Sequence, residues 1–298
     1  MSPAIRNAQA EPLASAALES VVAAAVAEDR GSGDLTSSNS VPEGARARAR
    51  LVARQAGVLA GMPVFRQVFL HCDPRCRFLA HVEDGQPIEP DQLVAEVEGD
   101  ARGLLLAERT ALNFVQRLSG IATSTAELVR LARGRVRVLD TRKTTPGLRA
   151  LEKYAVRCGG GENHRFGLFD EVMIKENHLE LSGQDLEGLT RSVRASVGPG
   201  IRMTVEARDG DEARAALRGG ADVLLLDNMS PAQLAALVPE LRELARESGR
   251  AVELEASGGI DAASLEAFAA CGLDRVSVGG LTHSAPALDL SLYLEALS

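Results

Sequence analysis

Residues 140–178 read DTRKTTPGLRALEKYAVRCGGGENHRFGLFDEVMIKENH, and this stretch decides the fold because it joins two short apolar runs, 136–139 and 171–174. Between Asp140 and Lys175 there are seven Lys/Arg and five Asp/Glu, in a 298-residue chain with a formal net charge of -8. Cationic side chains beside Gly-rich turns, in an otherwise acidic chain, indicate a site for small polyanions. Nucleic acid is not the expected partner, since such a partner favours a basic domain.

Similar apolar runs recur towards the C-terminus, and each is followed by residues that can do chemistry. The six runs are 136–139, 171–174, 203–205, 223–226, 252–254 and 276–278, with helical patterns between most of them. Alternating strands and helices predict a parallel sheet with crossover helices. Polar groups at the end of strand after strand are typical of the mouth of a (β/α) barrel. We therefore predict an incomplete TIM-like barrel; in the alternative, a doubly wound sheet, such groups would cluster at one switch point.

The first third of the chain has a different pattern. Strands are predicted at 47–53, 77–82 and 93–97, and helices at 13–28 and 62–70, which together predict a small α+β domain with an open sheet. A long helical pattern follows at 104–133. We predict an N-terminal domain at 1–120 and a barrel domain at 121–284. A C-terminal helix at 285–298 is expected to pack back on the N-terminal domain.

Two carboxylates end predicted strands, Glu206 and Asp227. Such residues often cap the next helix, but Ser230-Pro231 supplies a better cap after Asp227. The functional interpretation is that both carboxylates bind ribose hydroxyls or Mg²⁺, which prefers oxygen ligands and keeps several waters.

Two Gly-rich turns follow late strands, Ser257-Gly258-Gly259 and Val278-Gly279-Gly280. Backbone N–H groups in such turns bind phosphate, and late loops are the frequent phosphate site of barrels. The opposite wall would carry Arg142, Lys143, His164, Arg165 and Lys175. Several cations together point to a ligand with more than one acid group, although ion pairs with nearby carboxylates are the alternative.

The chain resembles the quinolinate phosphoribosyltransferase family over essentially its whole length. The motifs that carry the resemblance are EDRGSGDLTS, ERTALNFVQRLSGIAT, DTRKTTPGLRALEKYAV, GGGENHRFGLFDEVMIKENH, LLLDNMSP, EASGGI and SVGGLTHS. The resemblance implies an N-terminal α+β open-faced sandwich and a C-terminal α/β barrel with an incomplete set of strands. It also implies a pentosyltransferase of NAD biosynthesis. It would join quinolinate to 5-phosphoribosyl-1-pyrophosphate, giving nicotinate mononucleotide, pyrophosphate and CO₂ with Mg²⁺.

The resemblance also implies roles for individual residues. Helical periodicity alone makes Arg109 a solvated or ion-paired residue, whereas the resemblance places it in the active site of a neighbouring subunit. The implied quinolinate-binding residues are Arg109, Thr141, Arg142, His164, Arg165 and Lys175. The implied residues for phosphoribosyl pyrophosphate are Lys143, Glu206, Asp227, Ser257, Gly258, Gly259, Val278, Gly279 and Gly280. Lys143, Lys175, Glu206 and Asp227 would be catalytic, and Glu206 and Asp227 would hold Mg²⁺ directly or through water.

Two other enzymes remain as alternatives: a paralogous phosphoribosyltransferase for another acid, and a Schiff-base aldolase using Lys143 or Lys175. The expected assembly is a homodimer or a higher oligomer with shared active sites. No apolar run reaches the length of a membrane span, so we expect no membrane partner and a cytoplasmic location.

Overall fold

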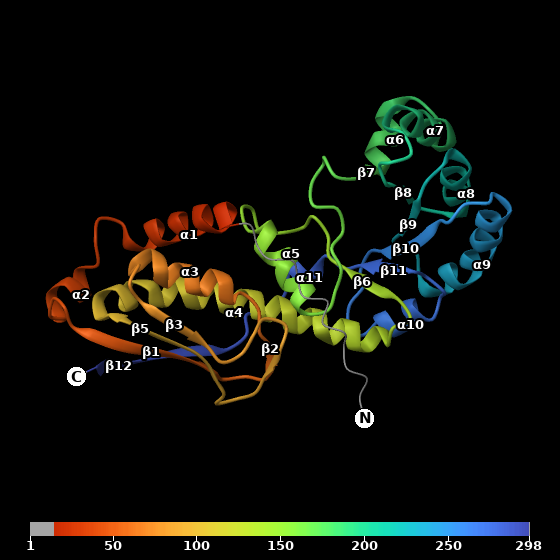
Figure 1. The fold of residues 1–298 in the computed structure, drawn as a ribbon. Helices are drawn as coiled ribbons and strands as arrows, with labels where there is room; N and C mark the ends of the chain where they lie inside the picture. The colour runs from red at the N-terminus through yellow and green to blue at the C-terminus, as the bar shows by residue number, and fades with distance from the viewer. Residues whose placement is uncertain (1–14, 298) are drawn as a thin grey trace. The chain divides into compact units, whose positions relative to one another are not determined.

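The structure is a computed structural model that describes residues 15–297 (Figure 1). The described chain forms two compact units. The first contains residues up to Ala126, Thr144–Gly160 and the segment from Leu281 onward, and the second contains Glu127–Lys143 and Gly161–Gly280. Because each unit collects separated stretches, no single cut in the chain describes this division. The domain ranges 1–120 and 121–284 stay a prediction.

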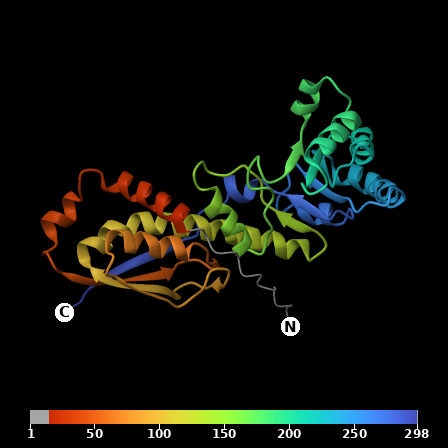
Figure 2. The ribbon, with the colours of Figure 1, turned by 45° about the horizontal axis from the view of Figure 1, so that its top comes forward.

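The first unit is built on an antiparallel sheet with the strand order β12-β1-β5-β3. Its strands are β12 (Leu290–Leu297), β1 (Arg46–Ala53), β5 (Leu93–Asp100) and β3 (Arg77–Ala80). Helices cover one face of this sheet (Figure 2). On β1 every second residue is buried, from Ala47 to Ala53, while Arg48 on the other face pairs with Glu98 at 2.5 Å. The predicted open-faced sandwich is therefore confirmed.

The remaining elements of this unit are mostly helical. They are α1 (Ser15–Arg30), α2 (Leu35–Ser40), α3 (Met62–Cys72), the first part of α4 (Ala101–Ala132), α5 (Arg149–Cys158), and the short strands β2 (Gly57–Val58) and β4 (Pro87–Ile88). Helix α3 turns Val64, Phe65, Val68 and Phe69 into the core and packs against α1. None of the helices in residues 15–297 has the length and apolar character that crossing a bilayer requires.

The C-terminal segment corrects one prediction. Residues 285–298 were expected to include a helix, but Leu290–Leu297 forms strand β12, which pairs antiparallel with all eight residues of β1. Leu, Glu and Ala favour a helix locally, but the edge of β1 offers a full ladder of hydrogen bonds, and this tertiary context decides. The alternating leucines at 290, 292 and 294 were the signal for a strand.

The second unit contains a parallel sheet with the strand order β6-β11-β10-β9-β8-β7. Its strands are β6 (Arg137–Leu139), β7 (Val172–Ile174), β8 (Met203–Ala207), β9 (Val223–Asp227), β10 (Glu253–Ser257) and β11 (Arg275–Ser277). All six coincide with predicted apolar runs. In the described part of the chain β6 and β7 do not pair with each other, which leaves the barrel incomplete, as predicted.

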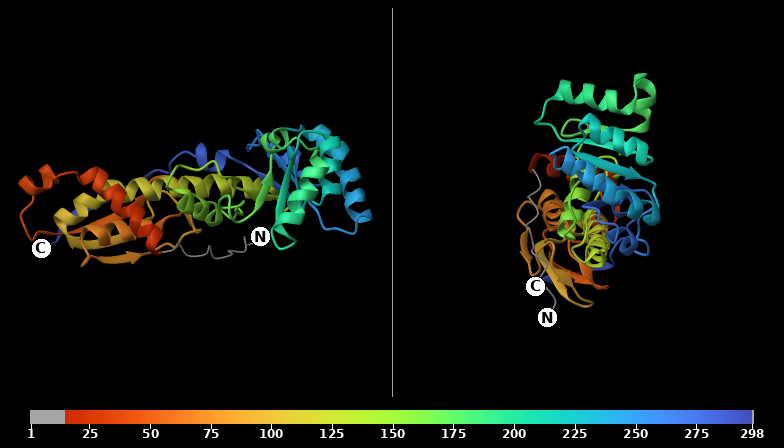
Figure 3. Two further views of the ribbon diagram at one scale, coloured as in Figure 1. Left: turned by 90° about the horizontal axis from the view of Figure 1, so that it is seen from above. Right: turned by 90° about the vertical axis from the view of Figure 1, so that its right-hand side faces the viewer.

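Helices follow the strands of this unit. They are α6 (Glu176–Ser182), α7 (Leu186–Val197), α8 (Gly210–Gly219), α9 (Pro231–Glu247) and α10 (Leu265–Ala269). Helix α11 (Gly280–His283) follows β11 but belongs, from Leu281 onward, to the first unit. Helix α8 packs against β8 and β9 and against its neighbours α7 and α9 (Figure 3). Ser230 caps α9, since its side chain accepts from the Gln233 N–H and Pro231 occupies the first turn. Asp227 is therefore not needed as a cap.

Candidate active site

A cavity of about 390 Å³ lies in the second unit at the carboxyl ends of the strands. Side chains two residues apart on a strand face the same side of a sheet, so Leu225 and Asp227 on β9 both reach it. Ser257 on β10 and Ser277 on β11 reach it in the same way. The predicted residues that line this cavity are Thr141, Arg142, Lys143, His164, Arg165, Lys175, Glu206, Asp227, Ser257 and Gly258. The cavity is at the barrel mouth that the sequence indicated.

Other predicted residues do not line this cavity. Gly259, Val278, Gly279 and Gly280 are not among its lining residues, and Val278 is buried. Arg109 belongs to the first unit, where it is exposed and borders a separate cavity with Glu28, Asp29 and Asn113. Its assignment to an active site stays a prediction.

The cationic wall of the cavity contains two neighbouring guanidinium groups. Arg165 is buried, and burial lowers its pKa; the positive charge of Arg142 lowers the pKa further, against the opposing effect of Glu171 and Asp170. A like charge disfavours the charged form, and an anion between the two groups would relieve this repulsion. The wall is thus arranged for an acidic ligand.

A buried aspartate fixes the segment that carries this wall. The Asp140 carboxylate accepts hydrogen bonds from the backbone N–H of His164 (2.8 Å) and from the side chain of Asn163 (2.6 Å). The backbone N–H groups of Asp140 and Glu162 bind the carbonyls of Glu162 and Val138, so the segment runs beside β6. The sequence placed Asp140 at a strand end but gave it no role, because its partners lie more than 20 residues away.

Two carboxylates face these cations. Glu206 forms an ion pair with the ammonium group of Lys175. The pKa of Asp227 is raised, first by burial and then by the charge of Glu206, against the opposing effects of Ser257, Lys175 and Lys143. Two anionic oxygens held close together attract a cation or sugar hydroxyl groups.

A close approach of two turns sets the floor of the site. Gly258 has φ of +101°, and a Cβ there would lie 2.8 Å from Cγ and 3.0 Å from Cα of Asn228. The backbone N–H of Asn228 donates to the Ser257 carbonyl, and the Asn228 side chain donates to Asp227 at 2.6 Å. Only glycine fits this position, so the Gly-rich turn holds Asp227 and Ser257 together.

The fold and the cavity define a class: an α/β-barrel enzyme that binds small anionic substrates at the carboxyl ends of its strands. Two family models match: "Quinolinate phosphoribosyl transferase, N-terminal domain" over residues 34–119 and the corresponding C-terminal domain over residues 121–293. The chain belongs to the quinolinate phosphoribosyltransferase family.

Individual relatives agree. The probable nicotinate-nucleotide pyrophosphorylase [carboxylating] of Bacillus subtilis is 42% identical over 89% of this chain and 89% of its own length. Among solved structures, NadC from Streptococcus pyogenes is 38% identical, with a TM-score of 0.89 and coverage of 96% and 99%. The nicotinate-nucleotide pyrophosphorylase of Francisella tularensis is 36% identical, with the same TM-score and coverage. The family resemblance is confirmed, and the Schiff-base aldolase is not supported.

Proposed function

We propose that the cavity at the carboxyl ends of the strands binds quinolinate and 5-phosphoribosyl-1-pyrophosphate, and that the family's pentosyl transfer takes place there. The products are nicotinate mononucleotide, pyrophosphate and CO₂, a step in the de novo synthesis of NAD. The observation that carries the proposal is the pair of guanidinium groups on Arg142 and Arg165, which line the same cavity. Burial lowers the Arg165 pKa, and the nearby charge of Arg142 lowers it further. Quinolinate carries two adjacent carboxylates, and guanidinium forks bind carboxylates in a bidentate way.

The charged residues on the two walls of the cavity would bind different substrates. Arg142, Arg165 and Lys175, with Thr141 on the same wall, would bind the carboxylates of quinolinate. The His164 ring, whose two nitrogens lie beside Arg165 and Glu255, would line that wall without donating to the substrate. Lys143, Glu206 and Asp227 would serve the ribose and pyrophosphate of the donor. Its 5′-phosphate would bind the backbone of the Ser257–Gly259 turn and of the Val278–Gly280 turn.

The chemistry follows from the charges. The pyridine nitrogen attacks C1 of the ribose while the pyrophosphate leaves, and positive charge develops on the sugar. Glu206 and Asp227 would stabilise that charge, and Lys143 would offset the negative charge of the pyrophosphate. The quaternised ring then accepts the electron pair left when the 2-carboxylate departs as CO₂. None of these steps requires a covalent enzyme intermediate.

The carboxylate pair fits a Mg²⁺ ion. Burial and then the charge of Glu206 raise the Asp227 pKa, and a divalent cation between the two carboxylates would relieve their repulsion. No group of three candidate protein ligands occurs in residues 15–297, which suits an ion held largely by substrate phosphates and water. When bound, Mg²⁺ would neutralise pyrophosphate charge.

A direct assay tests the proposal. The protein is mixed with quinolinate, phosphoribosyl pyrophosphate and Mg²⁺, and CO₂ and nicotinate mononucleotide are measured. We expect turnover of quinolinate and none of nicotinate, because nicotinate lacks the second carboxylate that the paired arginines would bind. Turnover of nicotinate alone would reject the assignment and favour a paralogue for another acid.

We also propose a homodimer in which Arg109 enters the neighbouring active site. The exposed position of Arg109 supports this proposal, since a partner can reach it. Arg109→Ala and Lys175→Ala should each be inactive alone, yet a refolded one-to-one mixture should recover about a quarter of wild-type activity, because half of the dimers are hybrids with one intact site.

The matched control for this mixture pairs Lys175→Ala with Glu206→Gln. Each barrel supplies both Lys175 and Glu206 to its own active site. Both sites of a hybrid dimer therefore carry one of the two changes, and no activity should return. Equal recovery in the two mixtures, or none in the first, would contradict a shared site.

A cytoplasmic location stays a prediction from the sequence.

A further inference from the structure

Both ring nitrogens of His164 face the protein interior. Nδ1 accepts a hydrogen bond from the backbone N–H of Arg165, at 2.7 Å. Nε2 lies 3.5 Å from the carboxylate oxygen Oε1 of Glu255, and both side chains are buried. Because Nδ1 is an acceptor, the Nε2 nitrogen carries a ring proton and lies on the side of the Glu255 carboxylate. The His164 ring therefore lies between the Glu255 carboxylate and the backbone N–H of Arg165, whose side chain lines the cavity.

Glu255 is held as an anion by groups on the inner face of the barrel. Its other oxygen lies 2.7 Å from Nε of Arg275, which is also buried. Burial alone would raise the Glu255 pKa, but His164, Arg275 and Ser277 together outweigh burial, and the pKa is lowered. A buried carboxylate with these partners keeps its charge and can orient an imidazole N–H.

The strand register makes this arrangement part of the fold. Glu255 on β10 stands directly opposite Arg275 on the parallel neighbour β11, and Ala256 opposite Val276. Residues 255 and 257 share the inner face, so Glu255 lies one layer below Ser257 at the mouth. From this layer Glu255 reaches the His164 ring, while Asp140 holds the His164 backbone from the side of β6.

We infer that Glu255 is a positioning residue for the quinolinate end of the active site. With Arg275 as its counter-ion, it fixes the tautomer and the orientation of His164. The His164 ring in turn holds the backbone of Arg165, so that the Arg165 guanidinium faces the cavity beside Arg142. This inference rests on the proposed dicarboxylate site.

The first test replaces Glu255 with a neutral residue of the same shape. In Glu255→Gln, we expect the KM for quinolinate to rise about ten- to a hundredfold, because small displacements of a binding group have effects of this size. The KM for phosphoribosyl pyrophosphate should change less than about twofold. The ¹⁵N chemical shifts of the His164 ring, in the ligand-free protein, should show loss of the single Nε2–H tautomer.

The matched control is Glu253→Gln. Glu253 lies on the same strand and inner face and also contacts Arg275, at 3.3 Å, but it is two residues further from the mouth. It should leave the quinolinate KM and the His164 shifts unchanged. Because Glu255→Gln leaves Arg275 buried beside a neutral group, a double change of Glu255→Leu with Arg275→Met removes both charges and guards against misfolding.

The outcomes separate the inference from the proposed function. A coupled change in quinolinate KM and His164 shifts, in Glu255→Gln and in the double variant but not in Glu253→Gln, supports the positioning role. Unchanged shifts in Glu255→Gln, or equal rises in KM for both substrates, would overturn it. Wild-type protein that fails to bind quinolinate would reject the proposed site, while the shifts would still decide whether Glu255 orients the ring.

Discussion

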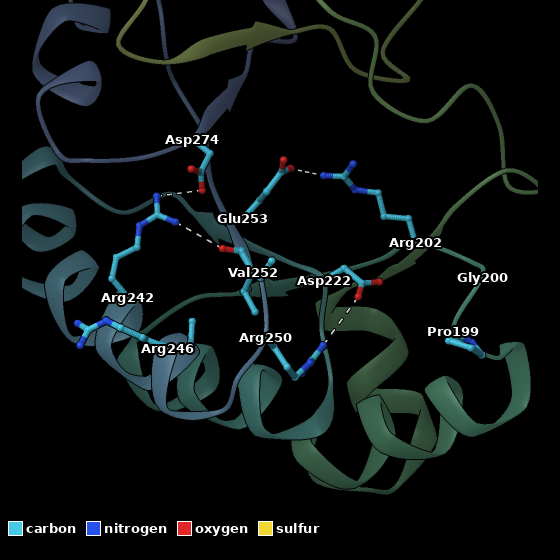
Figure 4. Close-up of a pocket in the computed structure, with 12 residues that line it drawn as sticks. Pro199, Gly200, Arg202, Asp222, Arg242, Arg246, Arg250, Val252, Glu253 and Asp274 are labelled. Carbon is cyan, nitrogen blue, oxygen red and sulfur yellow. Dashed lines mark hydrogen bonds and ion pairs between the residues drawn. The ribbon is translucent and has the colours of Figure 1, made fainter.

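The barrel carries an arginine-rich cavity at each end, and the two differ in how their charges are balanced. The cavity at the amino ends of the strands is larger, about 780 Å³, and is lined by Arg202, Arg242, Arg246 and Arg250 (Figure 4). Each of these arginines has a carboxylate partner, Glu253, Asp274, Glu243 and Asp222 respectively. Asp222 and Asp274 also accept backbone N–H groups of Met203 and Leu254. This end holds the strands together.

The cavity at the carboxyl ends has about half the volume, and its walls bring like charges near one another. There Arg142 and Arg165 repel each other, and Glu206 and Asp227 repel each other. Neither the volume of a cavity nor its number of arginines identifies a substrate site. Like charges brought together in a cavity are a better indication of a binding site, because a ligand of opposite charge would relieve their repulsion.

Removing one arginine from each end gives the largest expected contrast. Arg165→Leu should lower kcat/KM for quinolinate by about a hundredfold or more, because it leaves a substrate carboxylate unpaired. Arg242→Leu should leave kcat/KM unchanged and lower the unfolding temperature by a few degrees, since it removes a half-exposed ion pair worth roughly 1 kcal/mol. Steady-state kinetics and thermal unfolding of both variants measure these effects. An equal loss of activity in the two variants would contradict the proposal that only the cavity at the carboxyl ends binds substrate.

A smaller effect is expected from glycine substitutions at the two ends. Gly258→Ala combines a left-handed φ with a clash against Asn228, and should cost about 2–3 kcal/mol and most of the activity. Gly249→Ala, after α9, has φ of +69° but open space around it, and should cost only about 1 kcal/mol with full activity. Chemical denaturation compares the free energies of unfolding of the two variants. Similar losses would mean that the turn at Asn228 moves to accommodate the added Cβ at little cost.

The smallest effect concerns pH and has opposite signs at the two ends. The Glu253 pKa is lowered: burial opposes this, but Arg137, Arg202 and Arg275 outweigh it. Its stabilisation is therefore full above its ordinary value of 4.5 and is lost as the pH falls through the folded pKa. The Asp227 pKa is raised, so its charge reduces stability above that folded pKa.

At pH 7 Glu253→Gln should consequently lower the unfolding temperature and Asp227→Asn should raise it. Both differences should shrink in thermal unfolding scans as the pH falls below about 4. A lower unfolding temperature for Asp227→Asn at pH 7 would show that the charge of Asp227 does not destabilise the folded protein.

The barrel was the easier part to predict. Its strands are buried on both faces, so they are continuous apolar runs, and parallel topology brings their polar ends together. Strand β12 was missed because its Leu, Glu and Ala residues favour a helix locally, and because its partner β1, which decides the outcome, lies about 240 residues away. Glu255 was missed for a related reason: its partner Arg275 is set by the register of two strands, which sequence spacing does not reveal. Arg109 was singled out only by the family resemblance.

The position of β12 has a consequence for the order in which the protein is made. Strand β12 pairs along the whole of β1 and follows all six barrel strands in the chain, so the sheet of the first unit is completed only after those strands have left the ribosome. The barrel strands, all encoded earlier, are available to fold first. Strand β1 must therefore wait for a strand about 240 residues later, and deletion of Leu290–Leu297 would leave β1 with an open edge prone to aggregation.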